Sequence, residues 1–200
     1  MTIYDLKPAF QNLLRPVCRR LAGMGVSANQ VTLIALLLSV AVGITFALHP
    51  DSQWAALVIP VWLFVRMALN AIDGMMAREH NMQSALGGYL NELSDVVSDA
   101  ALYLPFALVA GVSAQLVVAI VLLAILTEMA GVVSIQVGAS RRYDGPMGKS
   151  DRAFVFGLLG LLLGMGVVLT PWINPALAVV AALTAWTVVN RVRCGLRELN

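Results

Sequence analysis

The sequence predicts an all-α integral membrane protein with six transmembrane helices preceded by an N-terminal amphipathic interfacial helix. Of its 200 residues, 60% are hydrophobic and only 12% are charged, whereas a typical soluble domain carries about 25% charged residues. The chain also contains six apolar runs close to the roughly 20 residues that a helix needs to cross a bilayer. We therefore expect one membrane domain over residues 1–200, with the interfacial helix in 1–25 and a six-helix bundle in 26–200.

The interfacial helix is predicted over residues 4–22, ahead of the apolar runs. Lys7, Arg15, Arg19 and Arg20 stand between apolar residues that recur at helical spacing. A basic amphipathic helix of this kind lies in the membrane interface and is attracted to anionic lipid; a solvated tail is the alternative. The apolar residues are Tyr4, Leu6, Phe10, Leu13, Leu14, Val17 and Leu21.

The six apolar runs predict the transmembrane helices in chain order. An even number of spans places both termini on the same side of the membrane. The approximate ranges are 29–48, 54–77, 86–110, 113–138, 152–170 and 174–195.

The distribution of Lys and Arg predicts on which side of the membrane the two termini lie. The connections HPDSQ, AGVSAQ and TPWINP contain neither residue. By the positive-inside rule, both termini then face the cytoplasm, as expected for a multi-pass protein of the inner (cytoplasmic) membrane. The basic residues of the other segments are Lys7, Arg15, Arg19, Arg20, Arg78, Arg141, Arg142, Lys149, Arg152, Arg191, Arg193 and Arg197.

Polar side chains lie on one face of the second predicted span. Arg66, Asn70 and Asp73 occupy positions i, i+4 and i+7, so they share an arc of about 60° on a helix. Ionisable residues inside a span are costly and are functional candidates for that reason.

The third predicted span carries a second polar face, which covers an arc of about 100°. The connection between the two spans, REHNMQS, is short, so the spans should be antiparallel neighbours. The two polar faces can then meet as an acidic pocket that opens to the cytoplasm. The polar residues of the third span are Asn91, Glu92, Asp95 and Asp99.

Clustered carboxylates repel one another unless a cation neutralises them. Divalent ions such as Mg²⁺ prefer oxygen ligands, and an Asn amide supplies one. Small residues nearby, such as Gly74 and Gly87, allow either close approach of a ligand or helix packing. A metal ion, a close-approach surface and nearby cations suit a diphosphate ligand. The alternative is structural ion pairing of Asp73 or Asp95 with Arg66, although Arg66 could instead pair with Glu128 of the fourth span.

Residues 70–95 resemble the signature of the CDP-alcohol phosphotransferases, D-x-x-D-G-x-x-A-R-(eight residues)-G-x-x-x-D-x-x-x-D. Every gap agrees, and the two departures are Asn70 and Asn91 in place of the first and third Asp. The segment SANQVTLIALLLS is similar to the family's approach to the first span, with Asn29 and Thr32 in place. The signature positions read Asn70, Asp73, Gly74, Ala77, Arg78, Gly87, Asn91 and Asp95.

The resemblance implies a divalent-metal-dependent phosphotransferase of phospholipid biosynthesis. A hydroxyl of a small alcohol acceptor attacks the phosphate of a CDP-alcohol, with CDP-diacylglycerol as the expected donor, and CMP leaves. Relatives bind one or two Mg²⁺ or Mn²⁺ ions and suggest a homodimer in the lipid bilayer. No nucleic-acid partner is expected.

The resemblance also assigns roles to residues. Asp95 is the expected catalytic base, and Lys149 and Arg152, in the basic connection ASRRYDGPMGKSDRAF, are candidates to contact an acceptor or phosphate. The predicted metal ligands are Asn70, Asp73, Asn91 and Asp95, with Asp99 one turn further along the helix. The predicted nucleotide-binding residues are Asn29, Thr32, Asp73, Gly74, Ala77, Arg78 and Gly87.

The two Asn residues leave several outcomes open, because an amide lowers the charge of a metal site and hence its expected affinity. The enzyme could work with one ion or a weaker pair, or Asp99 or Glu92 could take over as a ligand. A catalytically impaired member could instead bind CDP-lipid or nucleotide without turnover. A small ion-coupled transporter would also place acids inside the membrane, but inverted repeats and broken helices are not visible in the sequence.

Overall fold

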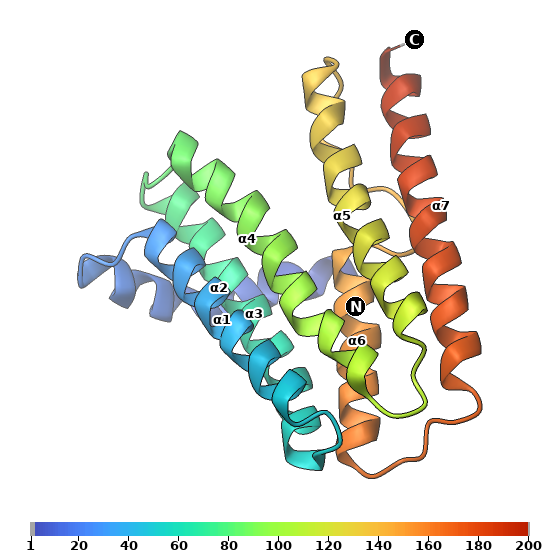
Figure 1. Cartoon of the computed structure of the whole chain (residues 1–200). Helices are drawn as coiled ribbons and strands as arrows, with labels where there is room; N and C mark the ends of the chain where they lie inside the picture. Colours follow the sequence, from blue (N-terminus) through green and yellow to red (C-terminus); the bar gives the residue numbers. More distant parts are fainter. Residues whose placement is uncertain (1–2, 200) are drawn as a thin grey trace. The chain divides into compact units, whose positions relative to one another are not determined.

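The structure is a computed structural model that describes residues 3–199, with side chains from residue 8 onward. This part of the chain is entirely helical, with seven α-helices, one 3₁₀ helix and no strand (Figure 1). The elements in order are α1 (Ile3–Gly23), α2 (Ala28–Leu48), α3 (Gln53–Glu79), α4 (Ala85–Tyr103), η1 (Leu104–Leu108), α5 (Ala114–Gln136), α6 (Lys149–Gly164) and α7 (Ile173–Leu199).

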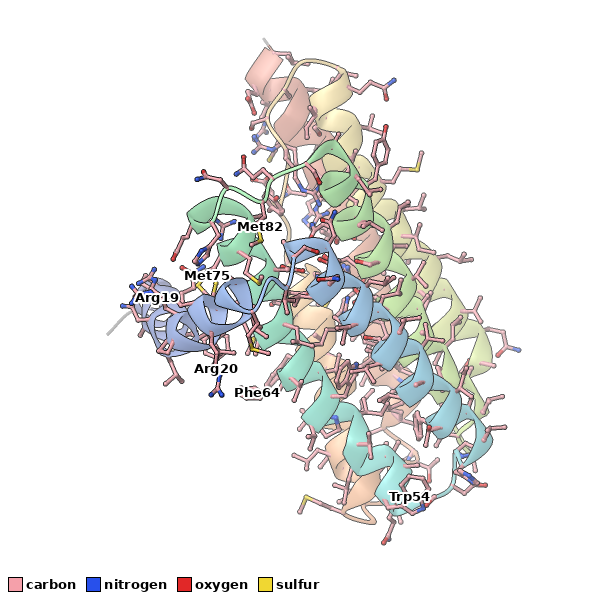
Figure 2. The ribbon with its side chains drawn as sticks, turned by 90° about the vertical axis from the view of Figure 1, so that its left-hand side faces the viewer. Arg19, Arg20, Trp54, Phe64, Met75 and Met82 are labelled. Atoms are coloured by element: carbon pink, nitrogen blue, oxygen red, sulfur yellow. The ribbon has the colours of Figure 1, made fainter. Side chains whose placement is uncertain are left out.

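The predicted N-terminal helix exists as α1. It is followed by Gly25 at φ +80°, a left-handed conformation that glycine adopts easily and that ends helices. Leu13 and Val17 are exposed, and Arg19 and Arg20 project away from the helix (Figure 2). These features suit an interfacial helix, which stays a prediction; the side chains of Tyr4, Leu6 and Lys7 lie outside the described residues.

Helices α2, α3, α5 and α7 match their predicted ranges to within a few residues. The start of α2 follows from a reciprocal cap: the Gln30 amide donates to Ser27 Oγ, and the Ser27 amide donates to Gln30 Oε1. Such a capping box satisfies amides that have no partner within the helix. At the start of α5, Ser113 Oγ accepts from the amide of Leu116 at 3.4 Å.

Two predicted ranges were wrong at their ends. The run 86–110 does not form one α-helix, because Pro105 lacks an amide proton and the chain tightens into η1 after Tyr103. The run 152–170 overlaps α6, which starts three residues earlier, at Lys149, and ends at Gly164. Asp151 caps its start by accepting from the Gly148 amide at 2.9 Å, and Gly166 at φ +77° follows its end.

Four of the described helices, α2, α3, α5 and α7, have the length and apolar composition to cross a membrane, as a multi-pass protein requires. Helix α6 has 16 residues, which span only about 24 Å, and α4 carries three acids. Six spans and the positive-inside topology therefore stay predictions.

Residue contacts divide the described chain into two compact units. The first contains residues up to Ala41 together with Trp62–Ser98. Cys18 of α1 is fully buried in its core, where Met75 of α3 lies beside α1 (Figure 2). Arg15 adds a two-pronged ion pair with Glu79, at 3.0 and 3.1 Å. The N-terminal helix is thus fastened to the end of α3.

The second unit contains Val42–Val61 and the residues from Asp99 onward. Within it, α5 packs along α7 and against η1. An aromatic group closes its core: Tyr103 stacks on Phe156 with ring centres 4.2 Å apart, and Phe106 meets both Phe156 and Phe46 edge-on.

Gly43 of α2 is the glycine whose replacement tests the packing of the second unit. A Cβ atom there would overlap the backbone carbonyl of Ala101 in α4, which cannot rotate away. Gly43→Ala should therefore lower the free energy of unfolding by about 2 kcal/mol or more, measured by thermal unfolding in detergent. Gly88→Ala is the matched control, because nothing lies within 4 Å of its Cβ position; equal unfolding temperatures for the two variants would contradict the packing.

Candidate functional site

A pocket of about 290 Å³ lies in the first unit, between the start of α2, the end of α3 and the start of α4. All seven residues predicted to bind nucleotide line it, together with Asn91. Segments that are far apart in the sequence therefore converge on one concave surface. The lining residues are Ala28, Asn29, Thr32, Asp73, Gly74, Ala77, Arg78, Met82, Gln83, Ser84, Gly87, Gly88 and Asn91.

Asp73 is the acid of this pocket, and it is held in place. Its side chain is buried, and the Thr32 hydroxyl lies 2.8 Å from its Oδ2 atom and 3.1 Å from the carbonyl of Ala28. The Thr32 hydroxyl orients the carboxylate from α2. A fixed carboxylate on a pocket wall suits a ligand that carries a cation.

Gly87 lets α4 approach α2 at the pocket. A Cβ atom on Gly87 would lie 2.8 Å from Asn29 Oδ1 and 3.1 Å from Ser84 Oγ, closer than side chains tolerate. The guanidinium of Arg78 lies along the helix beside Gly74, about 3.4 Å from where a Cβ would be. Gly87 therefore leaves room for Asn29 at the pocket wall, whereas a Cβ atom on Gly74 would make an ordinary van der Waals contact with Arg78.

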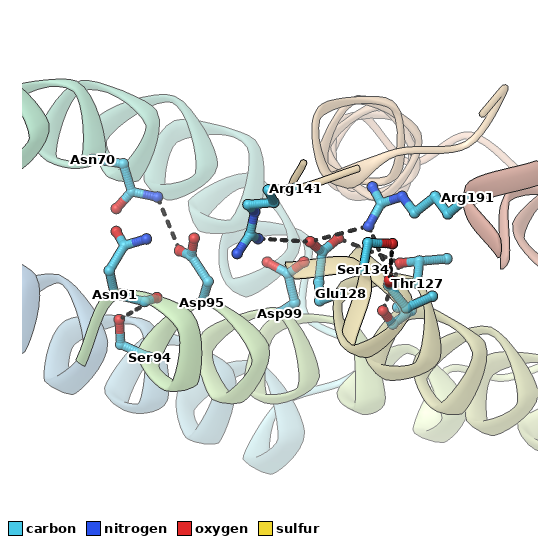
Figure 3. Close-up of polar contacts among 12 residues, drawn as sticks. Asn70, Asn91, Ser94, Asp95, Asp99, Thr127, Glu128, Ser134, Arg141 and Arg191 are labelled. Carbon is cyan, nitrogen blue, oxygen red and sulfur yellow. Dashed lines mark hydrogen bonds and ion pairs between the residues drawn. The ribbon is translucent and has the colours of Figure 1, made fainter. Parts of the chain in front are cut away.

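Asp95 is held by two donors from α3, Asn70 and Arg66; Figure 3 shows the bond from Asn70. Asn70 Nδ2 donates to its Oδ1 atom at 3.1 Å, and Arg66 Nη2 lies 3.2 Å from the same oxygen and 3.1 Å from the Asp95 carbonyl. Arg66 is 4% exposed. For Asp95, the ion pairing that the sequence left as an alternative is thus present.

The side chains predicted to bind metal offer oxygen atoms as ligands. Within the described residues no group of three or more His, Cys, Asp or Glu is arranged to hold a metal. Asp73 and Asp95 are the signature acids that remain, and Asn70 and Asn91 can add amide oxygens. Such an all-oxygen set fits a hard divalent cation such as Mg²⁺ or Mn²⁺.

The second unit contains a buried cluster of charges that the sequence did not predict. Glu128 of α5 accepts from Arg152 at 3.0 Å and Arg191 at 3.3 Å, and lies 3.6 Å from Arg141. Arg141 and Arg191 reach the carboxylate from two sides (Figure 3). An acid in the middle of a predicted span needs cationic partners, so the sequence indicated that Glu128 would be paired. It could not distinguish the three arginines of the cluster from Arg66, which pairs with Asp95 instead.

Arg152, a predicted acceptor contact, lies at the centre of this cluster and is fully buried. Its Nη1 atom donates to Thr127 Oγ1 at 3.0 Å and to the carbonyl of Met147 at 3.1 Å, and its Nη2 atom lies 3.7 Å from Asp99. Asp99 therefore pairs with a cation, and its role as a metal ligand stays a prediction. Lys149 begins α6 and is partly exposed.

The basic connection between α5 and α6 is fastened to the end of α7. Arg142 makes two bonds to Asp144, at 2.8 and 3.0 Å, and one to Glu198 at 2.7 Å. Ser140 also bonds Glu198. The hydrogen bonds from Arg142 lower the pKa of Asp144 below its ordinary value, and partial burial opposes this effect.

Comparisons with known proteins place this chain among membrane phosphotransferases. Residues 25–189 match the CDP-alcohol phosphatidyltransferase family. The chain is 45% identical over 193 residues to the inner membrane protein YnbA of Escherichia coli, covering 96% of each chain. It is 30% identical over 199 residues to the phosphatidylinositol phosphate synthase of Corynebacterium glutamicum, covering 95% of this chain and 86% of that relative.

Solved structures show the same fold. The phosphatidylinositol phosphate synthase PgsA1 of Mycobacterium tuberculosis in complex with manganese and citrate superimposes with a TM-score of 0.74 at 20% identity, covering 90% of this chain and 88% of that one. With CDP-DAG bound, the same protein gives a TM-score of 0.65 at 17% identity, covering 92% and 90%.

The pKa of Asp144 predicts how the basic connection responds to acid. Because that pKa lies below the ordinary 3.8, the carboxylate contributes its stability above this pH, and the contribution is lost as the pH falls through the lowered pKa. Hydrogen-exchange protection factors of residues 138–148 should hold from pH 7 to about 5 and drop below about 3.8. Asp144→Asn should show the low protection already at pH 7, whereas Asp51→Asn, in another connection, should not. Unchanged protection in Asp144→Asn would contradict the tether.

Proposed function

The chain belongs to the CDP-alcohol phosphatidyltransferase family, and from this premise we propose that it transfers a phosphatidyl or related phospho-alcohol group from a CDP-alcohol to a small hydroxyl acceptor and releases CMP. One observation carries the proposal: all seven residues expected to bind the nucleotide line a single pocket of the first unit. We propose CDP-diacylglycerol as the donor, because PgsA1 of M. tuberculosis, which has the same fold, was solved with CDP-DAG bound.

In the proposed complex the CDP group occupies the pocket of the first unit. Asn29 and Thr32 lie on its α2 side, and Gly74, Ala77 and Gly87 leave room for the nucleotide to approach the helices. Arg78 supplies a cation for the diphosphate. The lipid tails of the donor remain in the bilayer.

We propose that one divalent ion, Mg²⁺ or Mn²⁺, completes the site. Asp73 and Asp95 would hold it, with amide oxygens of Asn70 and Asn91. A bound ion offsets charge on the diphosphate and on the leaving CMP. Arg66 and Asn70 already place two donors on Asp95, which reduces the need for a second ion.

Asp95 is the proposed general base. Its carboxylate takes the proton of the acceptor hydroxyl as that oxygen attacks phosphorus. Asn70 and Arg66 both bind Oδ1, so they fix the orientation of the carboxylate toward the proposed site.

A member that binds CDP-lipid without turnover is the second candidate. The two Asn residues in the signature and the Asp95–Arg66 ion pair favour it. A small ion-coupled transporter has weaker support, because the acid Asp73 lines a pocket together with the residues expected to bind nucleotide.

For location, we propose an inner-membrane homodimer with six spans and with both termini and the site facing the cytoplasm. The relative YnbA is an inner membrane protein.

The decisive experiment measures CMP release by purified protein with CDP-diacylglycerol, Mg²⁺ or Mn²⁺ and a panel of alcohols. The proposal predicts metal-dependent CMP release with at least one acceptor. Asp95→Asn should lower the rate about a hundredfold or more, because a general base contributes on that scale, while CDP binding stays close to wild type. Retained CDP-lipid binding with no CMP from any acceptor would favour the non-catalytic candidate, and wild-type turnover in Asp95→Asn would exclude Asp95 as the base.

Restoring the signature acids tests the metal ligands. The double change Asn70→Asp and Asn91→Asp adds negative charge beside Asp73 and Asp95, so Mn²⁺ should bind at least about tenfold more tightly. Titration calorimetry with Mn²⁺ measures this directly, without any need for turnover. Asp51→Asn, in the connection between α2 and α3, is the control: it removes a charge from a residue outside the predicted ligand set and should change little. If the double variant keeps wild-type affinity, these two side chains do not face the ion.

A further inference from the structure

The N-terminal helix α1 affects how the pocket of the first unit receives its nucleotide. We propose that Arg15 of α1 is a positioning residue for this pocket: it holds the carboxylate of Glu79 away from Arg78, so that Arg78 stays free to bind the diphosphate. This inference rests on the proposed function, which assigns the diphosphate to Arg78. All of these residues belong to the first unit.

The contacts of Arg15 engage its whole guanidinium group. Its Nε and Nη2 atoms donate to the two carboxylate oxygens of Glu79 at 3.1 and 3.0 Å, and its Nη1 atom donates to Asn12 of the same helix. A two-pronged pair of this kind fixes the geometry of both groups as well as offsetting their charges. Both oxygens of the Glu79 carboxylate are thus directed toward α1.

Glu79 directly follows Arg78 in α3, so their Cα atoms are about 3.8 Å apart. Arg78 lines the pocket, and its guanidinium lies back along the helix, about 3.4 Å from the position of a Gly74 Cβ. Within the part of the chain that the structure describes, no carboxylate pairs with Arg78. Arg78 therefore lines the pocket as an unpaired cation, while α1 neutralises the acid beside it.

The packing of α1 keeps this ion pair close to the pocket. Ala77 and Met82, which line the pocket, also pack against the buried core that contains Cys18 of α1. The pocket wall therefore rests on a core that α1 completes. This packing holds α1, and Arg15 with it, against the end of α3.

The charge of Glu79 matters because the proposed ligand is an anion. The pocket already contains one carboxylate, Asp73, which the Thr32 hydroxyl holds. A free Glu79 carboxylate would add a second negative charge next to Arg78 and would repel a diphosphate. Water and salt screen such repulsion at a partly exposed position, so we expect an effect of modest size that depends on ionic strength.

Calorimetric titration with CDP in the presence of Mg²⁺ tests the inference without turnover, in a double-mutant cycle. Arg15→Gln should weaken CDP binding by at least about threefold, because the Glu79 carboxylate is then free, and added salt should reduce this loss. Glu79→Gln should bind CDP at least as tightly as wild type, and the double variant should return to the wild-type affinity. Arg20→Gln is the matched control: it removes the same charge from an arginine that projects away from α1 (Figure 2) and should change little.

A purely structural tether gives a different pattern. Arg15→Gln and Glu79→Gln would then both weaken CDP binding, and the double variant would not recover it. That pattern, or unchanged binding in Arg15→Gln, overturns the inference. If the predicted pattern holds but no acceptor releases CMP, the proposed turnover fails while the role of Arg15 stands; if wild-type protein binds no CDP, both fail. If Arg15→Gln does not fold, Glu79→Gln decides alone: CDP binding at least as tight as in wild type supports the role, and weaker binding overturns it.

Discussion

The cost of a charge in a low-dielectric interior governs the polar architecture of this protein. A chain with few charged residues buries Arg66, Asp73, Arg152 and Arg191, and an unpaired ion inside a membrane is expensive. The contacts of these groups follow from that cost: Asp73 accepts from Thr32, Arg66 pairs with Asp95, and Arg152 and Arg191 share Glu128. Asp73, Asp95 and Arg152, which are candidate site residues, therefore also make contacts that stabilise the fold.

The same constraint explains why the altered signature keeps its shape. An Asn in place of an Asp removes one negative charge but retains the size of the side chain and the ability to bond. Asn70 uses its amide nitrogen to hold Asp95, a contact that a carboxylate could make only if protonated. The guanidinium of Arg66 also contacts Asp95 and offsets part of its negative charge. A site with fewer carboxylates therefore needs less positive charge from a bound metal ion.

The sequence predicted the order and type of the helices because apolar length and the Lys and Arg pattern are local properties. The residues expected to bind nucleotide do line one pocket, whereas Asn70 and Asp95 are not among its lining residues. The predicted helix ends were wrong at Pro105, where the chain forms a 3₁₀ helix, and after Gly164, where α6 ends within an apolar run. The sequence could not choose the partner of Arg66 or find the arginines around Glu128, since partner choice depends on how helices rotate and pack.

Helix α4 shows how one element serves both polar systems. Asp95 and Asp99 are one turn apart on the same stripe, and each is fixed by an arginine from another helix, Arg66 of α3 and Arg152 of α6. Within the first unit, the ion pair with Arg66 resists rotation of α4 about its axis, because turning the helix would leave the buried Arg66 without Asp95. That fixed rotation presents Asn91 to the pocket and Asp95 to Asn70. The contact that neutralises Asp95 therefore also sets the geometry of the site.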